Sequence, residues 1–523
     1  MDPHWFARIG RTQIFSAAIL LFSVSLLGKA QSTPSSSVDP QIRDASQFDP
    51  NRPLAHELGM GVAEGFTFVA VGDCILSRPV SQYAQRQPDF AGILEILQRA
   101  DATFGNLETT IVDLRAFHGY PYSGPDDVTL AAEPRVAEDL AKMGFRLLSR
   151  ANNHALDWGI EGMHETSRWL DEAAIVHAGS GENRGLARAA QYFESGKGRV
   201  AIVSMASSFR PTTDALPPQG AAPGRPGISA LKLKKTTVVP ATVMGHLQAI
   251  ADELYPEKSK DAIKQASPAS NAPQKLTIFG NKFEVGPVYA YRYDMDPADL
   301  AEVLKSIRQG KQHSDFLVVS IHSHEPAKSL SSDPINDFAD NPAPFLHVLA
   351  RSAIDAGADE FVVTGIHHLG PIEIYKDRPI FYGLGDFFWS DIQEPLPADL
   401  YEQSQELLAK AFEYPQKATD ADLNNLLNAE AFAGELPFQS VITESHFDHG
   451  VLNELRLYPV ELGYGMKLTE SGIPRIASAK QGREILIHLG EMSQSYGTEI
   501  QVESVSPSHY VGFVRRQRGS AHK

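Results

Sequence analysis

The sequence of 523 residues predicts an α/β fold, in which strands and helices alternate along the chain. Short runs rich in β-branched and aromatic residues are followed by longer segments with apolar residues at helical spacing. Hydrophobic residues make up 42% of the chain, which is enough for a large core and argues against wholesale disorder. The length allows one large domain with insertions, or two domains.

The predicted elements follow one another in a regular order. The first strand is the β-rich run 66–71, which ends in Gly72-Asp73, and the first helix is the apolar-periodic segment 90–100. Further strands are predicted at 146–149, 200–205, 316–321, 360–364, 379–382, 440–444 and 451–459. Further helices are predicted at 133–143, 160–173, 300–308, 345–355 and 482–496.

Residues 1–30 have the pattern of a signal peptide. Arg8 and Arg11 form a basic segment, residues 14–27 are apolar, and Gly28-Lys29-Ala30 places small residues before a cleavage point. The apolar run is short for a membrane span, although an uncleaved N-terminal anchor is the alternative. No cysteine follows the run, which disfavours a lipoprotein anchor. We therefore expect export to the periplasm or the cell exterior.

Composition divides the remaining chain into segments. Residues 31–62 are rich in Ser, Pro, Asp and Gln and are interpreted as a linker. Residues 63–393 form the main domain, with a Pro-, Lys- and Ala-rich insertion at about 210–285 that we consider a candidate lid. Residues 394–436 are interpreted as a second, helical insertion. Residues 437–523 are predicted to complete the same domain.

Charge and cysteine usage exclude some classes of protein. The formal net charge is -17, from 64 acidic and 47 basic residues, so we expect no nucleic-acid partner. Cys74 is the single cysteine and cannot form an internal disulfide, so the fold must be held by packing, to which a bound metal would add. The chain has no Gly-x-x-x-x-Gly-Lys-Ser/Thr motif, which disfavours an ATP-driven ligase.

Five polar groups follow predicted strands, where open α/β sheets build their sites. Taken singly, each has an ordinary explanation as a turn, a helix N-cap or a surface pair. Five in one chain point to a shared site of carboxylates, amide oxygens and imidazoles, which suit Mn, Fe, Zn or similar ions. Two such ions would activate a water and hold a phosphate oxygen. The groups are Gly72-Asp73, 105–108, 152–154, 322–325 and 365–368.

The order of these motifs resembles the CapA family of capsule-synthesis proteins. That family is similar to calcineurin-like metallophosphoesterases and is associated with poly-γ-glutamate capsule production. The most specific motif is Ala-Asn-Asn-His-Ala-Leu-Asp-Trp-Gly at 151–159, and the segments 371–375, 379–387 and 471–475 also fit. The resemblance covers roughly residues 66–393 and resumes weakly at 440–500. It implies a four-layer αββα sandwich of the metallophosphoesterase type with helical insertions.

Carried over residue by residue, the resemblance implies a set of metal ligands. Asp73 would ligate one metal and Glu108 would bridge two. Asn153 would ligate the second metal through its side-chain oxygen, and His322 and His367 would complete that site.

The resemblance also implies a catalytic pair. His154 would lie over the scissile group as a general acid or a transition-state donor. Asp157 would orient His154, one helical turn away if Asn153 caps the following helix.

The sequence departs from the family pattern in three places. The usual Gly-His-His-Pro-His loop is shorter here, from Gly365 to Leu369, which leaves His368 as the candidate for the missing last ligand and allows one or two divalent ions. The usual His-Trp-Gly reads His322-Ser323-His324, which adds an imidazole, and the usual Gly-Asn-Phe reads Gly385-Asp386-Phe387.

Two functions remain open at this point. The first is an exported metal-dependent hydrolase acting on a phosphoester or a capsular polymer, with membrane partners in capsule synthesis. The alternative is a non-catalytic factor for polymer export or assembly, which the missing loop histidine favours. An acidic polymer would meet a chain of like charge, so binding would need metal or a basic patch such as Lys232, Lys234 and Lys235. The sequence does not specify the oligomeric state.

Overall fold

The structure is a computed structural model that describes residues 60–122, 129–255, 274–327, 342–392, 395–396, 398–431 and 434–516. The predicted signal peptide and nearly all of the predicted linker lie outside the described residues. In these ranges, no helix combines the length and apolar character needed to cross a membrane.

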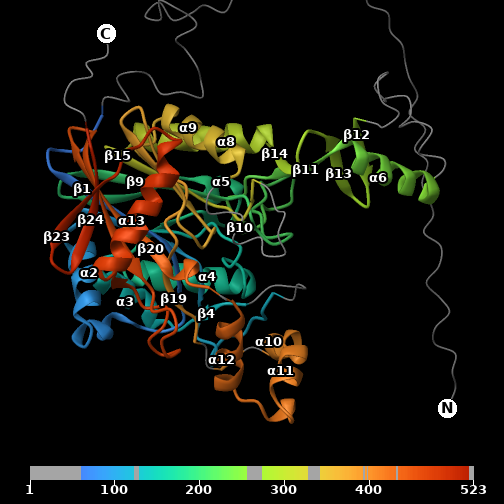
Figure 1. Cartoon of the computed structure of the whole chain (residues 1–523), viewed down its shortest axis with the longest axis horizontal. Coiled ribbons are helices and arrows are strands. Elements are labelled where there is room, and N and C mark those ends of the chain that lie inside the picture. The colour runs from blue at the N-terminus through green and yellow to red at the C-terminus, as the bar shows by residue number, and fades with distance from the viewer. Residues whose placement is uncertain are drawn as a thin grey trace, which may run out of the picture. The chain divides into compact units, whose positions relative to one another are not determined.

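Two β-sheets pack face to face at the centre of the fold (Figure 1). The larger sheet has the order β23-β24-β21-β20-β1-β2-β5-β6, with β19 beside β1 and β22 beside β21. The smaller sheet has the order β17-β18-β16-β15-β9-β8. The larger sheet consists of β1 (Phe66–Leu76), β2 (Ala102–Leu107), β5 (Leu147–Ser149), β6 (Val176–Ala178), β19 (Asp386–Ser390), β20 (Gln439–Asp448), β21 (Val451–Glu461), β22 (Arg475–Ile476), β23 (Gln501–Ser506) and β24 (His509–Arg515). The smaller consists of β8 (Gln191–Ser195), β9 (Gly198–Ala206), β15 (Phe316–His322), β16 (Glu360–Thr364), β17 (Ile372–Tyr375) and β18 (Arg378–Phe381).

Apolar side chains from both sheets meet between them. The rings of Phe66 and Phe68 lie 5.2 and 4.9 Å from that of Phe316 on β15, measured between centroids. The alternate residues Val69 and Val71 point to the other face of β1 and pack against the helical layer. Because both faces of β1 are covered, its sequence is a nearly continuous apolar run rather than an alternating one.

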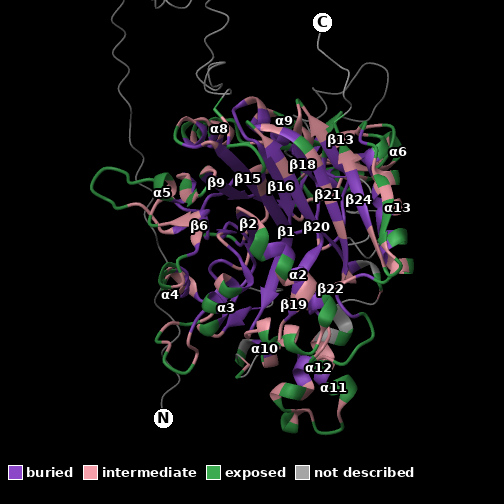
Figure 2. Ribbon diagram, turned by 90° about the vertical axis from the view of Figure 1, so that its left-hand side faces the viewer, coloured by how far each residue is buried: buried purple, intermediate pink, exposed green. Residues whose placement is uncertain are grey.

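Helices cover the outer face of each sheet, as Figures 1 and 2 show. Side chains of α2 (Pro88–Arg99) and α3 (Arg135–Met143) pack on the larger sheet, and those of α8 (Pro297–Gln312) and α9 (Pro344–Asp355) on the smaller. The α2 helix buries Phe90, Ile93 and Leu97, which share one face at helical spacing. The α/β class and the four-layer αββα order predicted above are therefore confirmed.

The segment that lacked clear periodicity forms a further small sheet. Its order is β12-β13-β11-β14, with its own core under α6 that includes Met244, Leu276 and Ile278. The elements are β11 (Leu233–Val239), α6 (Ala241–Leu254), β12 (Lys275–Ile278), β13 (Asn281–Val285) and β14 (Ala290–Met295).

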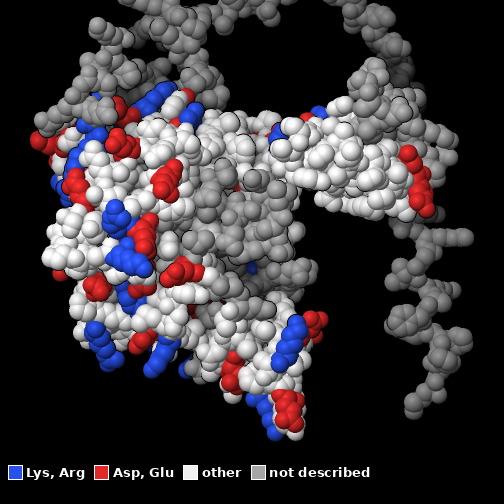
Figure 3. Space-filling model, in the orientation of Figure 1, with Lys and Arg blue, Asp and Glu red and all other residues white. Residues whose placement is uncertain are grey.

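On the face shown in Figure 3, acidic and basic side chains are interspersed rather than gathered into a basic patch.

The remaining elements connect or border these layers. Residues 398–431 form three short helices around buried Leu400, Leu408 and Leu423. The C-terminal strands β20 and β21 join the larger sheet, with β20 antiparallel to β1. The other strands and α-helices are β3 (Thr110–Ile111), β4 (Ala131–Ala132), α4 (Gly159–Glu172), β7 (Ser180–Gly181), α5 (Arg184–Arg188), β10 (Gly227–Ile228), α10 (Ala398–Gln403), α11 (Gln405–Ala411), α12 (Asp420–Ala431) and α13 (Ala479–Gln494).

Candidate metal centre

The polar groups that follow the strands converge at one edge of the paired sheets. Asp73 lies near the end of β1 and Glu108 directly follows β2. His322 is the last residue of β15, and His367 lies in the loop after β16. Strand β1 runs parallel to β2, and β15 runs parallel to β16. The carboxyl ends of these strands therefore lie at the same edge.

One candidate metal group consists of Asp73, Glu108 and His367, whose ligand atoms all lie within 4.8 Å of one another. Asp73 is held in place from both sides. The side-chain amide of Asn106 donates to its Oδ1 at 2.7 Å, and the backbone N–H of Gly365 donates to its Oδ2 at 2.8 Å. Its carboxylate therefore has a fixed orientation toward the site.

His367 is positioned by a carboxylate that the sequence alone did not link to it. Its Nδ1 lies 2.8 Å from Oδ1 of Asp386, and its backbone φ is 52°, in the left-handed region. With Nδ1 engaged by Asp386, Nε2 is the ring nitrogen left to face a metal. The aspartate that departs from the family pattern thus orients a predicted ligand.

The second candidate group consists of Glu108, His322 and His324, again within 4.8 Å of one another. The Nε2 atoms of the two histidines lie 3.0 Å apart, and Nε2 of His322 lies 2.8 Å from Oδ1 of Asn153. Gly365 makes this approach possible, because a Cβ at that position would lie 2.8 Å from Cδ2 of His324 and 2.9 Å from Cε1 of His322. Both candidate groups share Glu108.

The donor set fits divalent metal ions. Glu108 is the residue that both groups share, and its Oε2 is buried and has no hydrogen-bond partner among the described residues. An orphaned buried carboxylate oxygen is costly unless a cation or a water satisfies it. Carboxylates, imidazoles and an amide oxygen together suit Mn, Fe or Zn.

Burial and the mutual charges of the site shift the pKa values of its side chains. Burial, followed by the nearby charge of Glu108, raises the pKa of Asp73 to about 7. Burial also raises the pKa of Asp386, while His367 beside it partly offsets the effect. The pKa of His324 is lowered by burial and by the neighbouring His322, which keeps its imidazole neutral and able to bind a metal.

His154 and Asp157 form the predicted pair beside the metal groups. Nδ1 of His154 lies 2.8 Å from Oδ2 of Asp157. That carboxylate also accepts the backbone N–H of Leu130 at 2.6 Å and pairs with the buried guanidinium of Arg210 at 3.1 Å. Burial lowers the pKa of His154, but the charge and hydrogen bond of Asp157, together with the charge of Glu108, leave it raised.

A comparison with known protein families assigns most of the chain to one family. The sequence model described as "Bacterial capsule synthesis protein PGA_cap" matches residues 67–390, a span that contains every residue of both metal groups. The chain belongs to this capsule synthesis family. The resemblance stated from the sequence motifs is therefore confirmed.

Proteins similar to this chain differ in how much of it they match. The uncharacterized protein y4sH of Sinorhizobium fredii is 40% identical over 474 residues, covering 88% of this chain and 96% of its own length. The capsule biosynthesis protein CapA of Bacillus anthracis is 24% identical over 327 residues, or 62% of this chain and 60% of its own. A hypothetical protein from Thermus thermophilus aligns in three dimensions with a TM-score of 0.32 and 11% identity, over 76% of this chain and 99% of its own.

In this member of the capsule synthesis family, the structure groups some of the predicted site residues differently from the assignment made from the sequence. His367 groups with Asp73, whereas the resemblance assigned it to the second metal. Its neighbour His368 is buried and belongs to neither metal group among the described residues. Asn153 does not cap the following helix, because α4 begins only at Gly159.

Sequence reasoning assigned no role to several supporting residues. Asn152 donates to Oδ1 of Asn106 at 3.1 Å and thereby links two of the predicted motifs. Arg210 lies in the segment treated as an insertion, so no local signal distinguished it. Glu325 accepts hydroxyl hydrogen bonds from Ser207, Ser208 and Ser323 and is not in a metal group.

Proposed function

We propose that this chain is an exported metal-dependent hydrolase of the capsule synthesis family, acting on a phosphoester or on a capsular polymer. The observation that carries the proposal is the sharing of Glu108 by two ligand groups beside a His–Asp pair. Asp73, Glu108 and His367 would hold one ion, and Glu108, Asn153, His322 and His324 a second. Divalent ions bound there would polarise an ester oxygen and lower the pKa of bound water.

The chain's own residues supply binding geometry and a proton. Because Nδ1 of His154 faces Asp157, its Nε2 is the nitrogen available to a substrate. The raised pKa of His154 favours the imidazolium, which can donate a proton to the leaving oxygen. Arg210 and Leu130 hold Asp157 in place, so the ring direction is set before a substrate binds.

The first test is metal content. Purified parent protein, incubated with Mn²⁺ or Zn²⁺ and desalted, is expected to retain one or two ions per chain by elemental analysis. Asp73→Ala and His367→Ala should lose metal, while His164→Ala, an exposed histidine outside the site, should not. A parent chain that stays metal-free after this loading would overturn the hydrolase proposal.

The second test separates chemistry from metal binding. His154→Ala should retain the metal content of the parent but lose about 10²- to 10⁴-fold in turnover of bis(p-nitrophenyl) phosphate, as expected for a lost general acid. Turnover equal to that of the parent would contradict the assigned role of His154. The same experiment on His164→Ala controls for damage to the fold.

Export is part of the proposal and rests on the signal-peptide pattern of residues 1–30. Expression of the full chain, followed by fractionation and N-terminal sequencing, should recover a mature form beginning near Gln31 outside the cytoplasm. Recovery of the intact N-terminus in the membrane fraction would instead support the uncleaved anchor.

The second candidate is a non-catalytic capsule factor that uses the same centre to bind or move polymer, in contact with membrane partners. The observation that favours it is the altered loop, in which His368 follows His367 but joins neither metal group. Metal binding and polymer binding without any turnover would support this candidate over the hydrolase.

A further inference from the structure

Exposed apolar side chains occur at several places in the small lobe, which consists of β11, α6, β12, β13 and β14. Ile250 and Leu254 are exposed on α6, Phe279 in the turn between β12 and β13, and Val288 and Tyr289 in the segment before β14. Exposed apolar residues are common on protein surfaces, so exposure alone does not mark a binding site. The backbone, however, singles out Phe279.

Phe279 occupies a turn position that disfavours its side chain. Phe279 and Gly280 form the two-residue turn of the β12–β13 hairpin, and their φ angles are 52° and 76°. A hairpin turn in which both φ angles are positive favours Asn-Gly, because a bulky side chain is strained in the left-handed region. Phe279 is also 63% exposed and does not join the core under α6. Neither the local backbone nor packing therefore explains a phenylalanine at this position.

Two lysines adjoin this turn on the face of the sheet that points away from α6. Phe283 packs in the core under α6, so its neighbour Lys282 points to the opposite face. The ammonium of Lys282 lies beside that of Lys234 on β11, and this contact lowers the pKa of Lys282. Among the described residues neither lysine has an ion pair. Asp294 stands opposite Lys234 in the β11–β14 pair but interacts with Arg292, at 3.5 Å.

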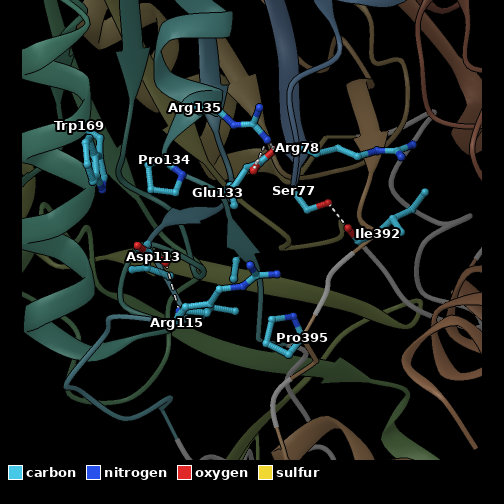
Figure 4. Close-up of a pocket in the computed structure, with 14 residues that line it drawn as sticks. Ser77, Arg78, Asp113, Arg115, Glu133, Pro134, Arg135, Trp169, Ile392 and Pro395 are labelled. Atoms are coloured by element: carbon cyan, nitrogen blue, oxygen red, sulfur yellow. Dashed lines mark hydrogen bonds and ion pairs between the residues drawn. The ribbon is translucent and has the colours of Figure 1, made fainter.

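The lysine pair differs from cations that a carboxylate neutralises. In the pocket of about 720 Å³ shown in Figure 4, Arg135 pairs with Glu133 at 2.8 Å. Within the small lobe, Arg292 pairs with Glu284 at 2.5 Å. Two neighbouring ammonium groups repel each other, and an anion from outside the chain would relieve that repulsion.

A protruding aromatic ring beside free lysines fits the surface of an anionic lipid bilayer better than a protein groove. Aromatic rings favour the boundary between headgroups and acyl chains, and the long lysine stems allow the ammonium groups to reach the lipid phosphates. A protein interface would bury both ammonium groups and would have to supply carboxylates for them. The net charge of -17 would repel the rest of the chain from an anionic surface and so limit the contact to this turn.

The base of the small lobe is tied to α8. The backbone N–H of Lys232, which precedes β11, donates to Oδ2 of Asp299 at 3.1 Å, and the buried Asp299 pairs with the buried Arg188 at 2.7 Å. The backbone N–H of Asp296, which follows β14, donates to the carbonyl of Lys232 at 2.8 Å. These bonds hold both segments that enter the lobe, so a contact at its turn would orient the main fold on the surface it touches.

We propose that the small lobe docks on an anionic membrane surface through Phe279, Lys234 and Lys282. The ring of Phe279 would enter the boundary between headgroups and acyl chains, and the two ammonium groups would bind lipid phosphates. This inference concerns where the protein is held and is independent of the chemistry at the metal centre.

The test places an environment-sensitive nitrobenzoxadiazole dye beside the turn in the full chain. Cys74, the single native cysteine, is buried, so Thr277→Cys on the exposed side of β12 provides one accessible labelling position. Vesicles of phosphatidylglycerol and phosphatidylcholine in equal parts should raise the dye fluorescence and shift it to the blue. Phosphatidylcholine alone should bind about tenfold more weakly or less. Because the dye reports on the turn, any membrane affinity of residues 1–30 does not enter the readout.

Phe279→Asn separates docking from folding. Asparagine suits the positive φ, so the melting temperature should stay the same or rise, while vesicle affinity should fall about tenfold because the apolar ring is lost. Lys234→Ala and Lys282→Ala should each weaken binding to the charged vesicles about fivefold. The matched control is Tyr414→Asn, an exposed aromatic residue outside the lobe with Lys417 4.8 Å from its ring centroid, which should bind like the parent.

Three results would each overturn the inference. A parent dye signal that does not respond to the charged vesicles would exclude the membrane as the partner. An unchanged response in Phe279→Asn would exclude the ring as an anchor, and a large loss of stability in that variant would assign the ring to the fold instead. Metal content and bis(p-nitrophenyl) phosphate turnover should stay at parental levels in all these variants, so a failed hydrolase proposal would show in the parent itself.

Discussion

Nδ1 of His367 lies 2.8 Å from Oδ1 of Asp386, and Asp386 stands in register with Asp73 across the parallel pair β1–β19. One strand pair thus places a candidate metal ligand and the carboxylate that orients a second candidate ligand. The approach of the two strands depends on Gly72, where a Cβ would lie 1.7 Å from the carbonyl oxygen of Gly385. Gly72 therefore allows these two backbones to come together, whereas a Cβ at Gly385 would lie 2.6 Å from the carbonyl oxygen of Gln439 on β20.

This relationship predicts a graded effect on metal binding. Asp386→Ala should lower the affinity for Mn²⁺ or Zn²⁺ by about 10- to 100-fold, because His367 loses the partner that fixes its ring. Asp386→Asn should lose less, since the amide oxygen can still accept from Nδ1. Chelator competition measures the affinity, and Asp89→Asn, an exposed carboxylate on α2, is the control. Parental affinity in Asp386→Ala would rule out the orienting role.

Gly365 is predicted to be intolerant of any side chain. Its φ is 93°, and an added Cβ would meet both His322 and His324 at 3.0 Å or less. Gly365→Ala should therefore destabilise the fold by about 1–3 kcal/mol and reduce metal content. The matched control is Gly92→Ala in α2, where a Cβ meets nothing within 4 Å and stability should rise slightly. Thermal unfolding and elemental analysis measure both effects, and a stable, fully metallated Gly365→Ala would be incompatible with this packing.

Asp157 is predicted to act through His154 and not through the metals. Asp157→Asn keeps the shape of the side chain but removes the negative charge that raises the pKa of His154. Turnover should fall by about 10²-fold or more while metal content stays at the parental level. Steady-state kinetics should show the loss in kcat rather than in KM. Loss of metal from Asp157→Asn would instead indicate a structural role in the centre.

Glu360 provides a test of pH-dependent stability away from the metal ligands. Burial raises its pKa to about 8, the hydrogen bond from Ser445 partly offsets this, and Asp359 adds to it. The folded state therefore holds a proton that the unfolded state releases above about pH 4.3. The contribution of this proton to stability is fully present below that pH and is lost as the pH rises toward about 8.

Glu360→Gln should remove this pH dependence because an amide does not ionise. Relative to the parent, its melting temperature should rise steadily between pH 5 and pH 8 and then level off. The free-energy difference is expected to be on the order of 1.4 kcal/mol per pH unit at most. Glu491→Gln, an exposed glutamate on α13, should show no such trend. A pH-independent difference between Glu360→Gln and the parent would show that the carboxyl is not protonated in the folded protein.

The order of strands and helices and the residues able to bind metal could be read from the sequence. Each strand or helix is a local pattern, so the predicted strand 360–364 coincides with β16 and the predicted helix 345–355 with all but the first residue of α9. Candidate ligands were visible because they follow these strands directly. The small sheet around β11 was not predicted, because β11 pairs with strands far along the chain and the strands lack a continuous buried face.

The tertiary structure alone decided how those ligands are shared. His367 and His368 are adjacent in sequence, yet the left-handed φ at His367 and the hydrogen bond to Asp386 turn only the first toward Asp73. The additional imidazole comes from His324 and not from His368. Gly365 permits this arrangement, because it leaves room for the rings of His322 and His324 to lie close together. Sequence patterns specify which side chains each strand end offers, but distances between different strand ends follow from sheet order and backbone contact, which no local pattern encodes.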